Sequence, residues 1–231
     1  MKILRKFYII KNKKINKKQK EIKEKLMNHE LLENNKVYLQ GEVVDEPTYS
    51  HEVLNEGFYT LNLSIPRLSG QSDIIPVTIS ERLLKSANIM VGDTIALRGQ
   101  FRSYNKIEEN KSKLVLTVFV RELCEIDENS NPNIIEIYGY ICKSPIYRTT
   151  PFNREITDVL MAVNRSYNKS DYIPCITWGR NARFVGELPV GTKLEMVGRI
   201  QSREYLKRQD GLDPVSKIAY EISVSKVVQC E

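Results

Sequence analysis

The chain has few of the residues on which most catalytic and metal sites depend. It contains two histidines, His29 and His51, and its four cysteines lie far apart, with no CxxC pair: Cys124, Cys142, Cys175 and Cys230. Zinc sites and disulfide frameworks require closely spaced ligands or paired cysteines. A histidine-activated nucleophile requires a histidine within reach. The sequence therefore predicts no metal site, no cofactor and no enzymatic activity.

Long apolar runs are also missing. No stretch approaches the ~20 apolar residues that span a bilayer, and the basic N-terminus lacks the apolar region and cleavage site of a signal peptide. We therefore expect a cytoplasmic protein without a membrane partner. The stretch GELPVGTK (186–193) resembles a phosphate loop, but Thr192 and Lys193 stand in the reverse order and a predicted strand follows. It does not predict a nucleotide site.

The net charge of +6 is unevenly distributed. Residues 1–26 carry eleven Lys and Arg against two Glu, residues 27–132 carry ten basic against sixteen acidic residues, and residues 133–231 carry fourteen against eleven. The high isoelectric point thus comes from the N-terminal tail. That tail (1–35) either grips phosphates as a basic arm or is not native before Met27, and both readings stay open.

An internal repeat organises the rest of the chain. With an offset of 98 residues, Gly41 aligns with Gly139, Arg67 with Arg165, and the stretch SDIIP (72–76) with SDYIP (170–174); after residue 90 the offset becomes 99. A period near 98 is too long for a solenoid and fits two tandem copies of a small domain. We expect a first domain over 36–124, a linker over 125–133 and a second domain over 134–229.

Each copy alternates apolar and polar residues with a period of two. Five such strands follow one another, with a short helix-like stretch (ERLLKSANI or GRNARFVGE) between the third and the fourth. Pro76 and Pro174 inside the third strand indicate a bulge or an edge position, and a glycine in the first strand suits a bulge or a bend. The pattern predicts an all-β protein of two tandem five-stranded OB-fold barrels behind a basic tail.

The second copy resembles the bacterial single-stranded DNA-binding protein family. The motifs that carry the resemblance are VNRSY, SDYIPCITWGRNA and VGTKLEMVGRIQSREY, in that order, between residues 163 and 205. In that family, aromatic residues at four positions stack on DNA bases. The resemblance therefore implies the same role for the four aromatic residues found there, Tyr167, Tyr172, Trp178 and Tyr205.

The first copy provides a test of whether these rings fill the core. At the same four places it has Ser69, Ile74, Ser80 and Lys106. A core position would keep a bulky apolar residue in both copies, so we interpret the rings as an exposed stacking surface. Basic residues surround it, and the sequence predicts that DNA is bound by the four rings together with Arg165, Lys169, Arg180, Arg203, Lys207 and Arg208.

The acidic, ring-poor first copy is predicted to serve as an assembly domain, or as a weak DNA surface that uses Arg67, Arg98, Arg102 and Lys106. The resemblance implies a homodimer that presents four OB-folds. The acidic tip that recruits replication proteins in the family is absent after Val228, so such partners stay an expectation only. The favoured function is sequence-nonspecific coating and protection of single-stranded DNA in replication, recombination or repair. The alternative is a primosome-type accessory protein whose main ligand is another protein.

Overall fold

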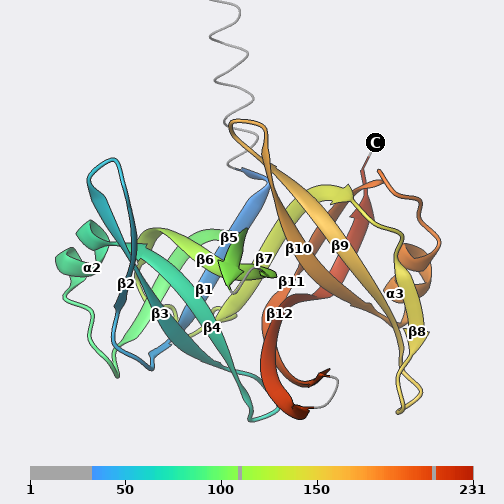
Figure 1. Cartoon of the computed structure of the whole chain (residues 1–231), viewed down its shortest axis with the longest axis horizontal. Helices are drawn as coiled ribbons and strands as arrows, with labels where there is room; N and C mark the ends of the chain where they lie inside the picture. The colour runs from blue at the N-terminus through green and yellow to red at the C-terminus, as the bar shows by residue number, and fades with distance from the viewer. Residues whose placement is uncertain (1–32, 109–110, 210–211, 231) are drawn as a thin grey trace, which may run out of the picture.

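The computed structural model describes residues 33–108, 111–209 and 212–230, and they form two barrels of the same design (Figure 1). The first barrel consists of β1 (Asn35–Val43), β2 (Thr48–Val53), β3 (Glu56–Pro66), β4 (Ser72–Ser80), α2 (Glu81–Ala87), β5 (Thr94–Glu108) and β6 (Lys111–Cys124). The second consists of β7 (Asn133–Ile141), β8 (Ile146–Thr149), β9 (Glu155–Arg165), β10 (Lys169–Trp178), α3 (Gly179–Gly186), β11 (Lys193–Gln209) and β12 (Leu212–Gln229). The predicted pair of OB-fold barrels is confirmed.

Each barrel has one short strand beyond the five that the sequence predicts. β2 and β8 pair only with β3 and β9, at the two ends of the sheet. All of their residues are exposed, so they show no alternation of buried and exposed positions, and periodicity cannot reveal them.

The two strand prolines cause no bulge. β3 and β4 pair in unbroken register, with Asn62 opposite Pro76, and β9 and β10 do the same around Pro174. On its other side β4 is paired with β6 at two positions only, Val77 and Thr78. Pro76 thus lies where the strand has an almost open edge, which is where a residue without an N–H is tolerated.

The glycines in β1 and β7 allow the barrels to close. A Cβ atom on Gly41 would lie 2.6 Å from the carbonyl oxygen of Ser64, and one on Gly139 would lie 2.6 Å from that of Ala162. At this point β1 stops pairing with β5 and turns to β3. The predicted bend is therefore confirmed, and only glycine fits because another strand passes so close.

The two barrels are joined edge to edge by β1 and β7, which pair in antiparallel register with Val37 opposite Ile135. These two residues are equivalent in the repeat, so the pairing has an approximate two-fold axis through them. The hydrogen bonds obey the same symmetry: Gln40 N donates to Pro132 O and Tyr138 N donates to Asn34 O, each over 2.8 Å. The first domain therefore pairs with the second domain of its own chain.

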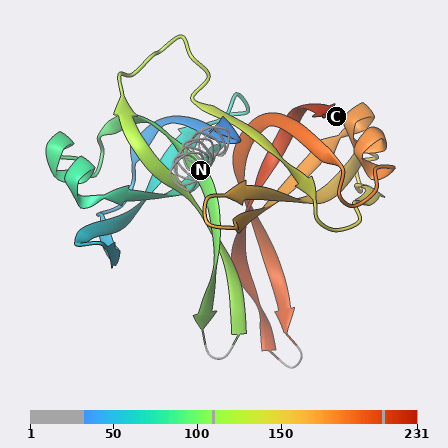
Figure 2. The same cartoon turned by 90° about the horizontal axis from the view of Figure 1, so that it is seen from above.

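The hairpins β5–β6 and β11–β12 extend beyond the barrels as two arms that project to the same side of the molecule (Figure 2). Of the residues discussed below, Tyr104 and Lys106 lie on β5, and Arg203 and Tyr205 lie on β11. The basic tail lies outside the described residues except for its last three positions. None of the helices in the described ranges is long and apolar enough to cross a membrane.

Candidate nucleic-acid interface

Tyr172 and Trp178 share the outward face of β10. The odd-numbered residues from Asp171 to Thr177 are buried, whereas the Tyr172 and Trp178 side chains keep 46% and 36% of their surface exposed. The indole N–H of Trp178 donates a hydrogen bond of 3.1 Å to Ser223 Oγ on β12. This bond holds the ring in place without burying it, so Trp178 is a surface residue and not part of the core.

Tyr167 and Tyr205 lie on other elements. Tyr167 is at the tip of the β9–β10 hairpin, where it and Asn168 have φ of 63° and 53°, as in a type I′ turn, and its side chain is 94% exposed. Tyr205 lies on the β11 arm, and the guanidinium carbon of Arg203 is 6.0 Å from the centre of its ring. The four predicted rings are thus all exposed, but they are spread over the second domain.

Two of the four rings, those of Tyr167 and Trp178, border different hollows. Tyr167 borders one of about 830 Å³ together with Tyr140 of β7, Lys169 and Lys193. Trp178 borders a smaller one, of about 430 Å³, with Ser202, Gln201, Ser223 and four arginines: Arg67, Arg154, Arg199 and Arg203. No acidic residue lines this second hollow, as far as the described part of the chain shows.

The first domain completes the hollow at Trp178. Arg67, at the end of β3, donates to Ser202 O over 3.0 Å and also pairs with Asp73 of β4. Arg199 of β11 pairs with the same carboxylate over 3.0 Å. The hydrogen bond to Asp73 raises the pKa of Arg67 above its ordinary value. Arg67 and Arg199 are therefore fixed by one buried carboxylate, which a search within the second copy alone could not reveal.

The predicted cations have different surroundings. Lys169, Arg180 and Arg203 are exposed, and Arg203 lies 3.5 Å from Glu221. Arg165 points to the domain boundary, where its Nε lies 3.2 Å from Asp171. The side chains of Lys207 and Arg208 lie outside the described residues. The structure thus brings Arg203 to Trp178, and it places Arg165 and Lys169 around the same hollow as Tyr167.

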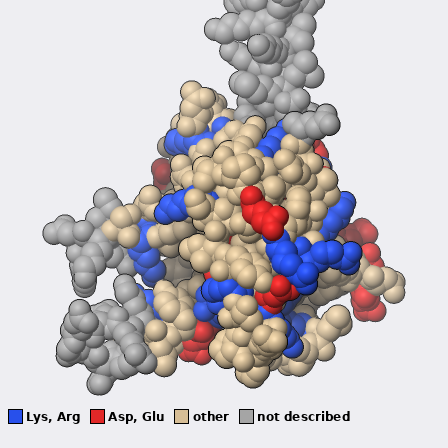
Figure 3. Space-filling view, turned by 90° about the vertical axis from the view of Figure 1, so that its right-hand side faces the viewer, with Lys and Arg blue, Asp and Glu red and all other residues tan. Residues whose placement is uncertain are grey.

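Viewed from the side of the second domain, Lys and Arg side chains gather over the middle of the surface, with Asp and Glu side chains among them (Figure 3). On this side the cations therefore do not form an unbroken basic face, whereas the hollow at Trp178 gathers four arginines. Such a hollow beside an exposed ring provides what single-stranded nucleic acid requires, cations for the phosphates and a flat surface for a base.

Comparison with known proteins finds a family that the second domain resembles. Residues 132–229 match the Single-strand binding protein family. The second domain is therefore similar to that family over its whole length. Single-stranded DNA-binding protein 1 of Staphylococcus aureus (strain COL) is 34% identical over 86 residues, 34% of this chain and 51% of that protein. Single-stranded DNA-binding protein A of Bacillus subtilis (strain 168) is 32% identical over 84 residues, 33% of this chain and 49% of that protein. The chain thus spans about half the length of these relatives.

The likeness to solved structures extends over both domains. The wild-type single-stranded DNA binding protein from Thermus aquaticus superposes with a TM-score of 0.64, at 19% identity, over 85% of this chain and 93% of that chain. At so low an identity the match establishes the fold, two OB-fold domains in one chain, and nothing about the ligand.

Proposed function

We propose that this protein binds single-stranded DNA without sequence preference and coats and protects it during replication, recombination or repair. The observation that carries the proposal is the exposed Trp178 ring beside a hollow lined by four arginines. Stacking on an aromatic ring accepts every base, and arginines bind the phosphates that all sequences share. The family that the second domain resembles and the names of its relatives support the same function.

The proposed DNA site lies on the second domain (134–229), and the ring-poor first domain (36–124) contributes Arg67 to it. It comprises the predicted residues Tyr167, Tyr172, Trp178, Tyr205, Arg165, Lys169, Arg180, Arg203, Lys207 and Arg208. We propose that the protein catalyses no reaction and that it acts in the cytoplasm. Replication proteins are the candidates for its protein partners there. Tyr167 and Trp178 border different hollows, so a bound strand must run across the domain to reach both.

The test uses Trp178, the only tryptophan of the chain. The full chain is titrated with oligo-dT at several salt concentrations while the indole fluorescence is recorded. We expect strong quenching, and an affinity that falls with salt by a slope of about −0.7 for each phosphate contacted. Unchanged fluorescence together with no shift in a mobility assay would overturn the proposal and favour the alternative, a protein as the main ligand.

We further propose that two chains associate to present four OB-folds. The edges of β1 and β7 are occupied by the pairing within the chain, so a second chain has to bind through another surface. Sedimentation equilibrium at micromolar concentration tests this proposal. A dimer mass supports it, and a monomer mass at all loading concentrations contradicts it.

A further inference from the structure

The first domain has a hollow of its own at the place equivalent to that of Trp178. It measures about 620 Å³ and is lined by Tyr49, Ser50, His51, Thr60, Thr78, Arg102, Ser103, Tyr104, Lys106, Thr117, Phe119 and Arg165. The second domain supplies Arg165 to this hollow, as the first domain supplies the equivalent Arg67 to the hollow at Trp178. The two hollows are thus related by the approximate two-fold axis of the chain.

The aromatic ring at this hollow comes from a different strand than the ring at the hollow of the second domain. In the second domain Trp178 at the end of β10 contacts Ser223 of β12. In the first domain the equivalent pair is Ser80 and Phe119, because Thr78 is paired with Phe119 as Ile176 is with Ser223. The first domain thus has a serine where the second has Trp178, and it has a ring where the second has Ser223. Phe119 lies 5.4 Å from Phe58, centre to centre.

The outward face of β5 shows the same kind of exchange. Gln100 and Arg102 stand where β11 has Arg199 and Gln201, and Tyr104 and Lys106 stand where β11 has Arg203 and Tyr205. In each pair the two domains have the same two kinds of side chain, but in the opposite order along the strand. A comparison position by position therefore finds the stacking rings missing, although the surface still combines rings and cations.

Two guanidinium groups at this hollow lie against an aromatic ring and a neutral amide. Arg102 lies 4.3 Å and Arg121 lies 5.3 Å from the centre of the Phe119 ring, and both donate to Gln100 Oε1, a neutral acceptor. Burial, together with the neighbouring charges of Arg121 and Arg165, lowers the pKa of Arg102 to about 10. Its buried Nε has no hydrogen-bond partner among the described residues.

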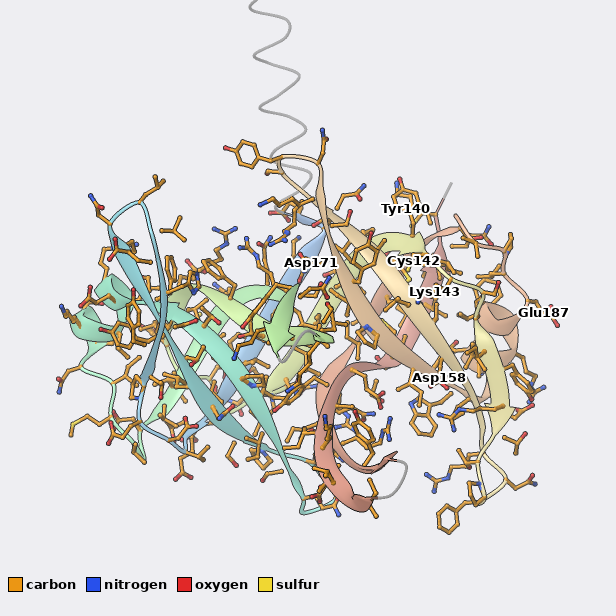
Figure 4. The ribbon with its side chains drawn as sticks, viewed as in Figure 1. Tyr140, Cys142, Lys143, Asp158, Asp171 and Glu187 are labelled. Atoms are coloured by element: carbon orange, nitrogen blue, oxygen red, sulfur yellow. The ribbon has the colours of Figure 1, made fainter. Side chains whose placement is uncertain are left out.

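No carboxylate is among the residues that line the hollow in the described part of the chain, although the first domain is acidic overall. Asp171 lies at the boundary between the domains (Figure 4) and accepts a hydrogen bond of 2.7 Å from Ser103 N. Asp171 also pairs with Arg165. An anion entering the hollow would thus meet the guanidinium group of Arg102, with no carboxylate among the described lining residues.

We infer that the first domain holds a second site for the same DNA single strand, in which Arg102 and Lys106 bind phosphates and the exposed rings of Tyr49 and Tyr104 stack on bases. This inference rests on the proposed function of the second domain. A strand long enough to cross the domain boundary would occupy both hollows, whereas a short one would fill the site at Trp178 alone.

The test compares two oligonucleotides. An OB-fold covers about 4–16 nucleotides, so dT of about 8 nucleotides reports one site through Trp178 quenching, and dT of about 30 nucleotides spans both. In the variant Tyr104→Ala/Lys106→Ala, we expect the affinity for the long oligonucleotide to fall by roughly 5- to 150-fold, the equivalent of one stacked ring. The quenching curve of the short one should not move.

Two further variants make the result specific. Arg102→Gln introduces the residue that β11 carries at the equivalent place, so it should fold and weaken only the long oligonucleotide. Arg82→Gln/Lys85→Gln removes two charges on α2 of the same domain, outside the hollow, and serves as the control. Unchanged affinity for the long oligonucleotide, or an equal loss for the short one, would overturn the inference. Failure of the unaltered protein to bind either oligonucleotide would instead overturn the proposed function.

Discussion

The two domains differ at one helix start in a way that separates stability from function. In the first domain Ser80 precedes α2, and its hydroxyl accepts a hydrogen bond of 3.4 Å from Leu83 N. In the second domain Trp178 occupies the same position before α3, and no side chain caps the helix. A serine at this position satisfies a free N–H of the helix, whereas an exposed tryptophan offers a ring to solvent. The second domain thus gives up a cap for a binding surface.

The buried carboxylates at the domain boundary differ as well. Asp73 accepts a hydrogen bond of 2.7 Å from Ser202 N and pairs with two arginines, Arg67 and Arg199. Asp171 accepts the equivalent bond from Ser103 N but pairs with Arg165 alone, because Gln100 stands where the second domain has Arg199. The backbone of the interface is symmetric, and its charges are not.

The largest effect is expected from removing the rings of the second domain. Tyr172→Ala/Trp178→Ala should weaken binding of oligo-dT by about 2–6 kcal/mol, since each stacked base contributes about 1–3 kcal/mol. Fluorescence anisotropy with a labelled oligonucleotide measures the loss. The matched control, Ile74→Ala/Ser80→Ala in the first domain, should leave the affinity as it is. An equal loss in both variants would mean that the rings act through folding.

Asp73→Ala should destabilise the fold by about 3 kcal/mol, because it leaves Arg67 and Arg199 facing each other at the boundary without their shared anion. The side chain of Asp73 is only 1% exposed. The control is Asp158→Ala, which breaks the exposed ion pair with Arg148 and should cost about 0–1 kcal/mol. Urea unfolding at pH 7 compares the two. Equal losses would show that the buried network contributes no more than a surface pair.

A smaller effect is expected at the helix start of the first domain. Ser80→Ala should reduce the free energy of unfolding by about 1 kcal/mol, the usual value of a lost N-cap, and leave the affinity for short oligo-dT unchanged. Trp178→Ala at the equivalent position should lower the affinity. Thermal unfolding and Trp178 quenching measure the first variant, and anisotropy measures the second. A weaker affinity in Ser80→Ala would contradict the separation of stability from binding.

The sequence was sufficient for the parts of this molecule that depend on local pattern. Alternation with a period of two located strands such as β3 and β10, and the repeat showed two copies. Alternation failed for β2 and β8, because a strand with both faces exposed carries no such pattern. The family resemblance pointed to Tyr172 and Trp178, and the comparison of the two copies predicted that their rings are exposed. The exposed side chains of both residues support that prediction.

Other features depend on contacts that no alignment of the two copies contains. Arg67 lines the hollow at Trp178 because β1 pairs with β7. This position could not be predicted from either copy alone. Phe119 escaped notice because its equivalent is Ser223, at an offset of 104 residues, whereas the repeat was followed with offsets of 98 and 99. The second arm is longer than the first, which moves the last strand out of register.

The smallest effect concerns the pH dependence of the unfolding free energy. It is expected from Asp171, which pairs with Arg165, whereas Asp73 pairs with two arginines. Burial is the main cause that raises the pKa of Asp171 above its ordinary value of 3.8. The folded protein therefore binds this proton more tightly than the unfolded chain does, and the stability that this group contributes is complete below about pH 4 and is lost as the pH rises through its folded pKa. Asp171→Asn removes the titration and keeps an oxygen to accept the Ser103 N–H.

The difference in unfolding free energy between the unaltered protein and Asp171→Asn should consequently shrink between pH 4 and pH 7, with the variant relatively most destabilised at the acidic end. Urea unfolding at half-unit steps measures it, with Asp158→Asn on the surface of β9 as the control. A difference that grows with pH would mean that Arg165 compensates Asp171 as fully as Arg67 and Arg199 compensate Asp73. The charge asymmetry between the two halves of the interface would then have no energetic consequence.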